Sequence, residues 1–345
     1  MPRRRSCIIG KRVSIFVSPR VLLRLFLHSQ MLPILEGGEE TLVGGQAVME
    51  GVMMRAPHSY CVSVRRKDGS IVSDEKPLER LSERHRIFKL PLFRGLGTLY
   101  QALKLGYGAL KFSSDQALAD LAPAEADGKA PKEMPGWMVT GNLLFSVAFM
   151  IFLYKFMPLL LTTRLGKVYP ALMGRVPFNL AEGIIRVAIL VVFLYAVSRF
   201  KDMRRIFEYH GAEHKVVWAF EKRGPIDVAS SRACTRFHPR CGTSFLLVVM
   251  GISMVLYMFL PFRSFAMRFV GRLALLPLIV GVSYEFIRYA AKAQGRLWRW
   301  ASQPGLWLQR VTTREPDDRQ LETAIKALET AMELETRRGG ELVVA

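Results

Sequence analysis

The chain has 345 residues, half of them hydrophobic, and a formal net charge of +20 at pH 7. The apolar residues gather in a few long runs, which excludes an ordinary water-soluble globular chain. We interpret the excess charge through membrane topology first: anionic lipid headgroups are the expected partner, and ribosomal RNA or other nucleic acid is a lesser one.

Residues 1–40 are expected to form a basic N-terminal extension. Residues 1–35 hold seven basic residues and no acidic one. Arg20 and Arg24 interrupt the apolar run that a signal peptide needs. Three interpretations stay open: a basic membrane-surface arm, a weak targeting segment, or an upstream extension of a product that starts near Met31.

Three further segments precede the long apolar runs. Residues 41–86 alternate apolar and polar positions and turn at Asp68–Gly69, which predicts a small cytoplasmic β unit. Residues 87–112 repeat Leu and Tyr at helical spacing, which predicts an amphipathic interfacial helix. Residues 113–135 are rich in Ala, Pro and acidic residues, as in a mobile linker.

Four segments are long and apolar enough to cross a bilayer, which takes about 20 helical residues. They are 136–161, 180–200, 244–262 and 266–290, with Pro277 and Gly281 as candidate kink points in the last. The fold class is therefore predicted as a mainly α polytopic membrane protein. It has four transmembrane helices, a small N-terminal β unit, and amphipathic helices on the cytoplasmic side.

With four spans, both termini share one side of the membrane with the loop 201–243. This loop carries nine basic residues, and the other two loops carry only a few each. The positive-inside rule then places the termini and this loop in the cytoplasm. All four cysteines fall on that side, where thiols stay reduced, so metal ligation or packing is favoured over disulfides. They are Cys7, Cys61, Cys234 and Cys241.

The C-terminal segment 291–345 is predicted to be cytoplasmic and to contain one amphipathic helix. Leu321, Ile325, Leu328 and Met332 share one helical face behind Asp317 and Asp318, which suits packing better than chemistry.

The stretch HGAEH, residues 210–214, contains the strongest candidate site. His210, Glu213 and His214 lie on one helical face, because positions i, i+3 and i+4 converge. The pattern H-x-x-E-H is that of zinc sites in which two His bind the metal and the Glu is a general base. The alternative is a polar, hydrogen-bonded helix face.

A second cluster, RFHPRCGTSF, lies in the same loop. It offers His238 and Cys241, and a loop that returns to the bilayer can bring this turn onto the first helix. His210 and His214 would be ligands, with His238 or Cys241 as the third, water at an open position, and Glu213 as a base or further ligand. If all four bind, the site is closed and structural. Both arrangements stay open.

Other polar residues carry weaker signals. Glu182 is predicted to pair with Arg186 and Glu285 with Arg288, although carboxylates beside a membrane cavity could instead serve a carrier. The stretch GLWLQRVTTREPDD is explained by an interfacial Trp307 and a helix start after Pro316.

Four separated motifs also agree in order with a known family: GGQAVMEGVMMR, YHGAEHK, HPRCGTSF and PGLWLQRVTTREPDD. Over residues 42–335 the chain resembles the YqhQ-like family of bacterial membrane proteins, a family of unknown function. The resemblance implies a multi-pass protein of the bacterial cytoplasmic (inner) membrane, described as a predicted metal-dependent enzyme. It also suggests that the gene lies near genes of translation factors. Residues 1–40 fall outside it.

The leading functional hypothesis is a membrane-embedded, zinc-dependent enzyme, a hydrolase, with its site on the cytoplasmic side. The alternative is a non-enzymatic membrane scaffold or biogenesis factor in which a structural metal fastens the loop. Neither hypothesis names a substrate or a protein partner.

Overall fold

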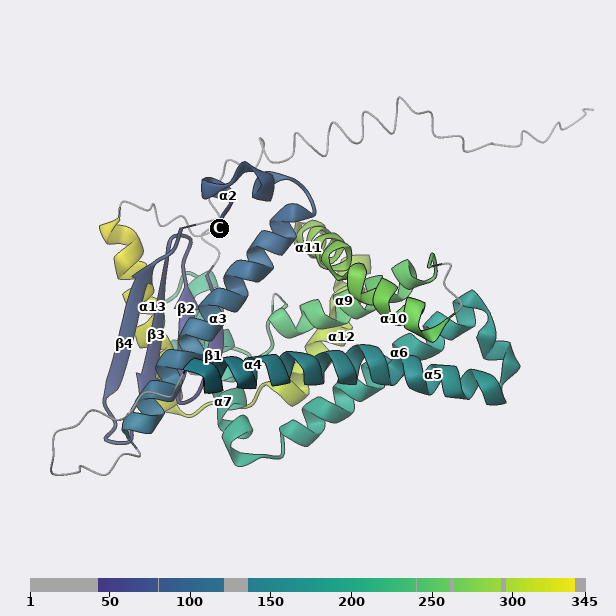
Figure 1. Ribbon diagram of the computed structural model, residues 1–345. Coiled ribbons are helices and arrows are strands. Elements are labelled where there is room, and N and C mark those ends of the chain that lie inside the picture. Colours follow the sequence, from purple (N-terminus) through teal and green to yellow (C-terminus); the bar gives the residue numbers. More distant parts are fainter. Residues whose placement is uncertain are drawn as a thin grey trace, which may run out of the picture. The chain divides into compact units, whose positions relative to one another are not determined.

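The computed structural model describes residues 43–79, 81–120, 136–239, 241–260, 264–292 and 296–338. The predicted N-terminal extension, 1–40, lies outside these residues, and so does most of the predicted linker. Within them the protein is mainly helical, with one small sheet near the N-terminal end (Figure 1).

The sheet is a four-stranded antiparallel meander that confirms the predicted β unit. Its strands, in spatial order, are β1 (Gly44–Val48), β2 (Gly51–Arg55), β3 (Ser59–Arg65) and β4 (Ile71–Pro77). The predicted turn joins β3 to β4, and Gly69 adopts a φ of 89° there, a region that suits glycine.

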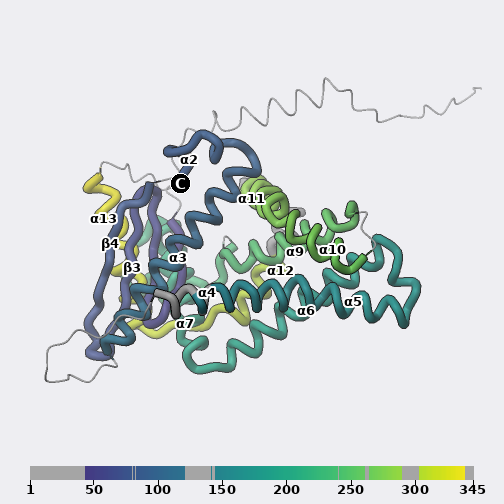
Figure 2. Tube along the Cα trace, in the orientation of Figure 1, coloured from purple at the N-terminus to yellow at the C-terminus, as the bar shows by residue number. Residues whose placement is uncertain are grey.

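Helices cover both faces of the sheet (Figures 1 and 2). On β2, Val52 and Met54 pack with α7 (Lys201–Glu221) and α13 (Asp318–Arg337), whereas Met53, between them, packs on the opposite side with α3 (Phe93–Ala119). This alternation follows from the pleat, which turns successive side chains to opposite faces. The apolar face predicted for the C-terminal helix is confirmed: Leu321, Ile325, Leu328 and Met332 all join the core with α7.

Helix α3 differs from the predicted amphipathic helix in its bounds. It continues to Ala119, into the segment predicted as a linker. The apolar residues Leu103, Tyr107 and Leu110 are exposed, and a face rich in glycine is buried instead. Gly95 explains this: an added Cβ would lie 2.7 Å from the Cβ of Tyr284, so close packing of α3 on the apolar helices requires a glycine.

The apolar runs form six α-helices and one π-helical turn. Their bounds are α4 Gly136–Ile151, the π turn Phe152–Phe156, α5 Met157–Val168, α6 Arg175–Val197, α9 Gly242–Tyr257, α10 Phe265–Ala274 and α11 Leu276–Lys292, with the 3₁₀ turn Pro170–Met173 between α5 and α6. Helix α9 packs against α6, α11 and α12 (Arg296–Thr312). The short elements elsewhere are α2 (Leu81–Arg84), the 3₁₀ turn Arg86–Lys89, and α8 (Val228–Arg232).

The described residues contain fewer clear membrane spans than the four predicted. Two helices, Leu144–Val168 and Arg175–Val197, are long and apolar enough to cross a membrane. Helices α10 and α11 meet at 49° and would add a third span if they act together. Helix α9 has 16 residues, below the roughly 20 that a span takes. The break before α11 lies directly ahead of the predicted kink residue Pro277.

Candidate metal centre

Helix α7 carries the HGAEH stretch into the core beside the sheet. Its residues from Gly211 to Val217 are buried. Gly211 lies where the chain after α12 crosses the helix, and an added Cβ there would lie 2.0 Å from the carbonyl oxygen of Arg314. The same crossing is fastened by the Arg314 amide, which donates to the carbonyl oxygen of Phe207 at 2.8 Å. The glycine therefore allows the close approach that puts the end of α12 beside His210.

Three of the predicted site residues come together in space. One ligand atom each from His210, His214 and Cys241 lies within 4.8 Å of the others. The His210 Nε2 is 3.4 Å from the Cys241 Sγ, and the two imidazole rings are 4.5 Å apart between centroids. Zinc bonds of about 2.1 Å to nitrogen and 2.3 Å to sulfur place ligand atoms about 3.5 Å apart in a tetrahedron, so the distance between His210 and Cys241 fits the ion.

Backbone carbonyls fix the tautomer of both histidines. The Nδ1 of His210 lies 2.8 Å from the carbonyl oxygen of Thr312, and the Nδ1 of His214 lies 2.6 Å from that of Arg236. A carbonyl only accepts hydrogen bonds, so each Nδ1 carries the proton and each Nε2 keeps a lone pair. Metal-binding histidines in proteins are oriented in this way.

Cys241 occupies the N-cap position of α9. The positive end of a helix favours negative charge on the sulfur atom. The hydroxyl oxygen of Thr243 is 3.1 Å from the Sγ, a further contact suited to a thiolate. Both features suit a cysteine that binds a metal ion.

His238 lies next to this group but outside it. Its Nε2 is 3.2 Å from a Glu221 carboxylate oxygen, and its ring lies 4.8 Å from Trp218 and 5.7 Å from the His214 ring. Its backbone is held by Gln309, whose Oε1 accepts from the His238 amide and whose Nε2 donates to the His238 carbonyl, both at 2.8 Å. The structure thus brings Cys241, rather than His238, to the two histidines of α7.

Glu213, the predicted base, is engaged with the sheet. One of its carboxylate oxygens accepts a hydrogen bond from the Gly45 amide of β1 at 3.0 Å, and the residue is 7% exposed. An added Cβ at Gly45 would lie 2.9 Å from the Cγ of Glu213, so the glycine makes room for this contact. Glu213 therefore links the helix of the candidate centre to the sheet.

Glu182 and Glu285, the two carboxylates with weaker functional signals in the sequence, both form ion pairs. Glu182 pairs with Arg186, as predicted, and additionally with Arg272. Glu285 pairs with Arg94 on α3, a partner that local spacing on its own helix could not indicate.

Two residues of the centre's support were missed in the sequence. Gln309 and Thr312 belong to the stretch WLQRVTT. From sequence alone, this stretch is attributed to an interfacial Trp307 and a helix start, and is not connected with the site. A signal was present: Gln309 is a polar residue on a helix at 0% exposure, which requires partners for its amide.

Comparisons with known proteins give a family but no activity. A family model described as "Protein of unknown function (DUF1385)" matches residues 90–334. The chain is also 31% identical over 297 residues to a protein of Bacillus subtilis (strain 168) described as "Uncharacterized protein YqhQ", covering 85% of this chain and 92% of that one. The resemblance to the YqhQ-like family is thereby confirmed. No solved structure matches the chain.

Proposed function

The chain belongs to the DUF1385 family of proteins of unknown function, and we propose that it is a membrane-embedded, zinc-dependent hydrolase whose metal ligands are His210, His214 and Cys241. One observation carries the proposal. Both histidines donate from Nδ1 to backbone carbonyls, which leaves each Nε2 with a lone pair, and a ring nitrogen of each lies within 4.8 Å of the Cys241 sulfur. Two imidazoles and a thiolate are a donor set that zinc prefers.

Three protein ligands are typical of catalytic rather than structural zinc, because the fourth position stays open to water. A zinc ion bound there would lower the pKa of such a water to about 7. Glu213, one helical turn from His210, would be the general base for such a water. The hydrogen bond from the Gly45 amide orients its carboxylate.

A second candidate is a structural metal centre in a membrane scaffold. It is favoured by the position of the ligands, which join α7 to the N-cap residue of α9, and by the contact of Glu213 with β1. In this case the ion would fasten the loop between α7 and α9, and Glu213 would only position the sheet.

Glu213→Gln separates the two candidates, because glutamine keeps an oxygen that can accept from Gly45 but is not a base. If the protein is a hydrolase, the Glu213→Gln variant should fold and bind zinc normally. It should lose at least about a hundredfold of the zinc-dependent hydrolysis of a panel of fluorogenic esters, phosphodiesters and peptides. If the protein is a scaffold, neither the wild type nor Glu213→Gln should show zinc-dependent hydrolysis. An active protein that Glu213→Gln leaves unchanged would refute the role of Glu213 as base.

For the topology we propose that α9 and the α10–α11 pair also cross the bacterial inner membrane, with both termini and the metal centre cytoplasmic. The basic residues of the loop between α6 and α9 support this orientation. Gly174→Cys, before α6, and Gly224→Cys, after α7, test it. A membrane-impermeant maleimide on cells with a permeabilised outer membrane should label only the former, and the reverse pattern would refute the orientation.

A further inference from the structure

A group of charged side chains is buried among the apolar helices. Glu182 and Arg186 on α6 and Arg272 on α10 are at most 2% exposed. The Glu182 carboxylate pairs with both guanidinium groups, at 2.7 Å for Arg272. Lys155, in the π turn Phe152–Phe156, donates to the hydroxyl of Tyr257 at 2.8 Å. Such π turns inside α-helices often mark functional sites.

Positive charge is in excess in this group. Lys155, Arg186 and Arg272 surround the Tyr257 ring, with cation-to-centroid distances of 5.4, 5.4 and 4.8 Å. Among the described residues, Glu182 is the one carboxylate in an ion pair with any of these three cations. The ring offsets part of the charge but carries no formal charge itself. An uncompensated charge among apolar helices is strongly unfavourable, so an anion is needed.

Hydrogen-bond donors in the group also lack acceptors. Among the residues that the structure describes, the buried Nε of Arg186 and the buried Nε and Nη1 of Arg272 have no hydrogen-bond partner. Buried donors are nearly always paired in proteins. Unpaired guanidinium nitrogens beside an excess of positive charge therefore point to an acceptor that carries negative charge.

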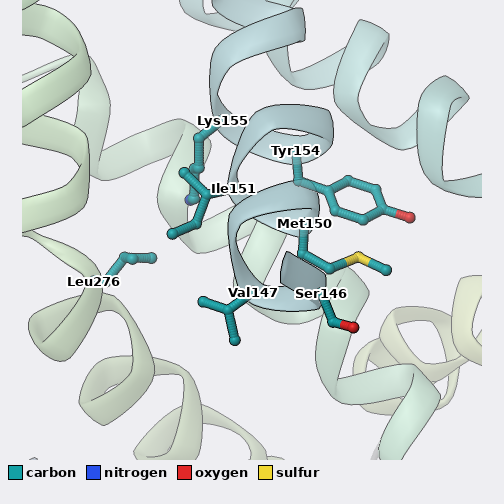
Figure 3. Close-up of a pocket in the computed structure, with 7 residues that line it drawn as sticks. All are labelled: Ser146, Val147, Met150, Ile151, Tyr154, Lys155 and Leu276. Atoms are coloured by element: carbon teal, nitrogen blue, oxygen red, sulfur yellow. The ribbon is translucent and has the colours of Figure 1, made fainter. Parts of the chain in front are cut away.

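An apolar groove leads to this group from the side of the helices. It has a volume of about 380 Å³ and is lined by Ser146, Val147, Met150, Ile151, Tyr154, Lys155 and Leu276. Figure 3 shows Val147, Ile151 and Lys155 in a row along one side of a helix, with Leu276 across from them on another helix. The neighbouring Leu144 and Phe145 are 64% and 70% exposed, as expected for a surface that faces lipid chains.

We propose that this groove binds one acyl chain of an anionic phospholipid, whose phosphate lies beside Lys155 and balances the buried cations. A lipid is favoured over a free anion because the groove is apolar and the neighbouring Leu144 and Phe145 are exposed apolar side chains. The site is separate from the metal centre: Cys241 and Tyr257 are at opposite ends of α9, about 24 Å apart at 1.5 Å per residue.

The test measures lipid retention by native mass spectrometry on the full chain purified in detergent. Dioleoyl phosphatidylglycerol is the anionic probe, dioleoyl phosphatidylcholine the zwitterionic one, and inorganic phosphate the free anion. Lys155→Met removes the charge and keeps the chain length, and Lys155→Arg is the matched control. We expect the wild type to retain about one phosphatidylglycerol. Lys155→Met should retain it at least about tenfold more weakly, and Lys155→Arg should bind nearly as the wild type does.

Three results would overturn the proposal. The first is equal retention of the two lipids by the wild type, and the second is displacement of phosphatidylglycerol by millimolar phosphate, which would indicate a small-anion site. The third concerns the fold: Lys155→Met removes an uncompensated charge, so it should unfold at the same or a higher temperature in lipid-free detergent. A clearly lower unfolding temperature would mean that groups of the protein itself compensate the charge of Lys155.

Discussion

The Nδ1 of His210 donates to the carbonyl oxygen of Thr312 across 2.8 Å, although 102 positions separate the two residues in the chain. Thr312 is the last residue of α12, and the last carbonyls of a helix have no partner within it. Gln309, one turn earlier on the same helix, holds the backbone of His238. Helix α12 thus contacts both His210 and the turn that leads to Cys241.

Gln309→Ala should weaken metal binding without removing a ligand. The substitution removes both side-chain hydrogen bonds of Gln309 to the His238 backbone and so loosens the turn that leads to Cys241. Loss of a contact that supports a ligand typically weakens metal affinity by about 10–100-fold. Competition with a chromophoric zinc chelator measures this. Gln101→Ala is the control, because Gln101 also donates from its side chain to a backbone carbonyl but lies on α3. Equal zinc affinity in both variants would contradict the role given to α12.

Gly211→Ala should destabilise the protein by about 1–3 kcal/mol, the usual penalty for overpacking. The added methyl group would lie 2.0 Å from the Arg314 carbonyl oxygen, a backbone atom that cannot rotate away. Thermal unfolding in detergent measures the change. Gly108→Ala is the matched control: it is helical, exposed and has open space around its Cβ position, so it should be neutral or stabilising by up to about 1 kcal/mol. Unfolding at the wild-type temperature in Gly211→Ala would argue against the crossing of α7 by residues 313–316.

Acid should weaken the attachment of α13 to the sheet through Glu335. Burial tends to raise the pKa of this carboxyl, but hydrogen bonds from His58 and Ser59 outweigh burial and lower its pKa below the usual value. A group whose pKa is lowered by folding stabilises the fold above its unfolded pKa, about 4.3, and loses that contribution as pH falls through the folded value. Between pH 6 and pH 3 the wild type should therefore lose about 1 kcal/mol more stability than Glu335→Gln.

Glu333→Gln is the control for this comparison. Its side chain lies on the same helix, is 58% exposed and pairs with Arg337, so its replacement should change the unfolding free energy by at most about 0.5 kcal/mol at either pH. Parallel pH profiles for the wild type and Glu335→Gln would contradict the assignment to Glu335.

Local patterns predicted the sheet, the C-terminal helix and two histidines of the centre, because each depends on residues close in sequence. The turn at Gly69 and the buried face of α13 follow from periodicity and backbone preference alone. The choice between His238 and Cys241 could not be predicted, because it depends on how Gln309, some 70 positions away, holds the turn between them.

The glycine-rich contact face of α3 was not predicted, and the number of spans was predicted less well, for two reasons. Glycines at helix contacts, such as Gly95, count against a helix in propensity yet allow its closest packing. Hydropathy detects apolar runs but not where a helix ends, and α9 ends at Tyr257, whose hydroxyl joins the buried charged group.

X-ray absorption at the zinc edge of the purified, zinc-loaded protein would show which atoms bind the ion. We expect one sulfur neighbour at about 2.3 Å and two imidazole nitrogens at about 2.0–2.1 Å, with the remaining position filled by a light atom. Cys241→Ser should remove the sulfur signal, and Cys234→Ser should leave it in place. A spectrum without sulfur, or one that Cys241→Ser does not change, would contradict the metal centre of His210, His214 and Cys241.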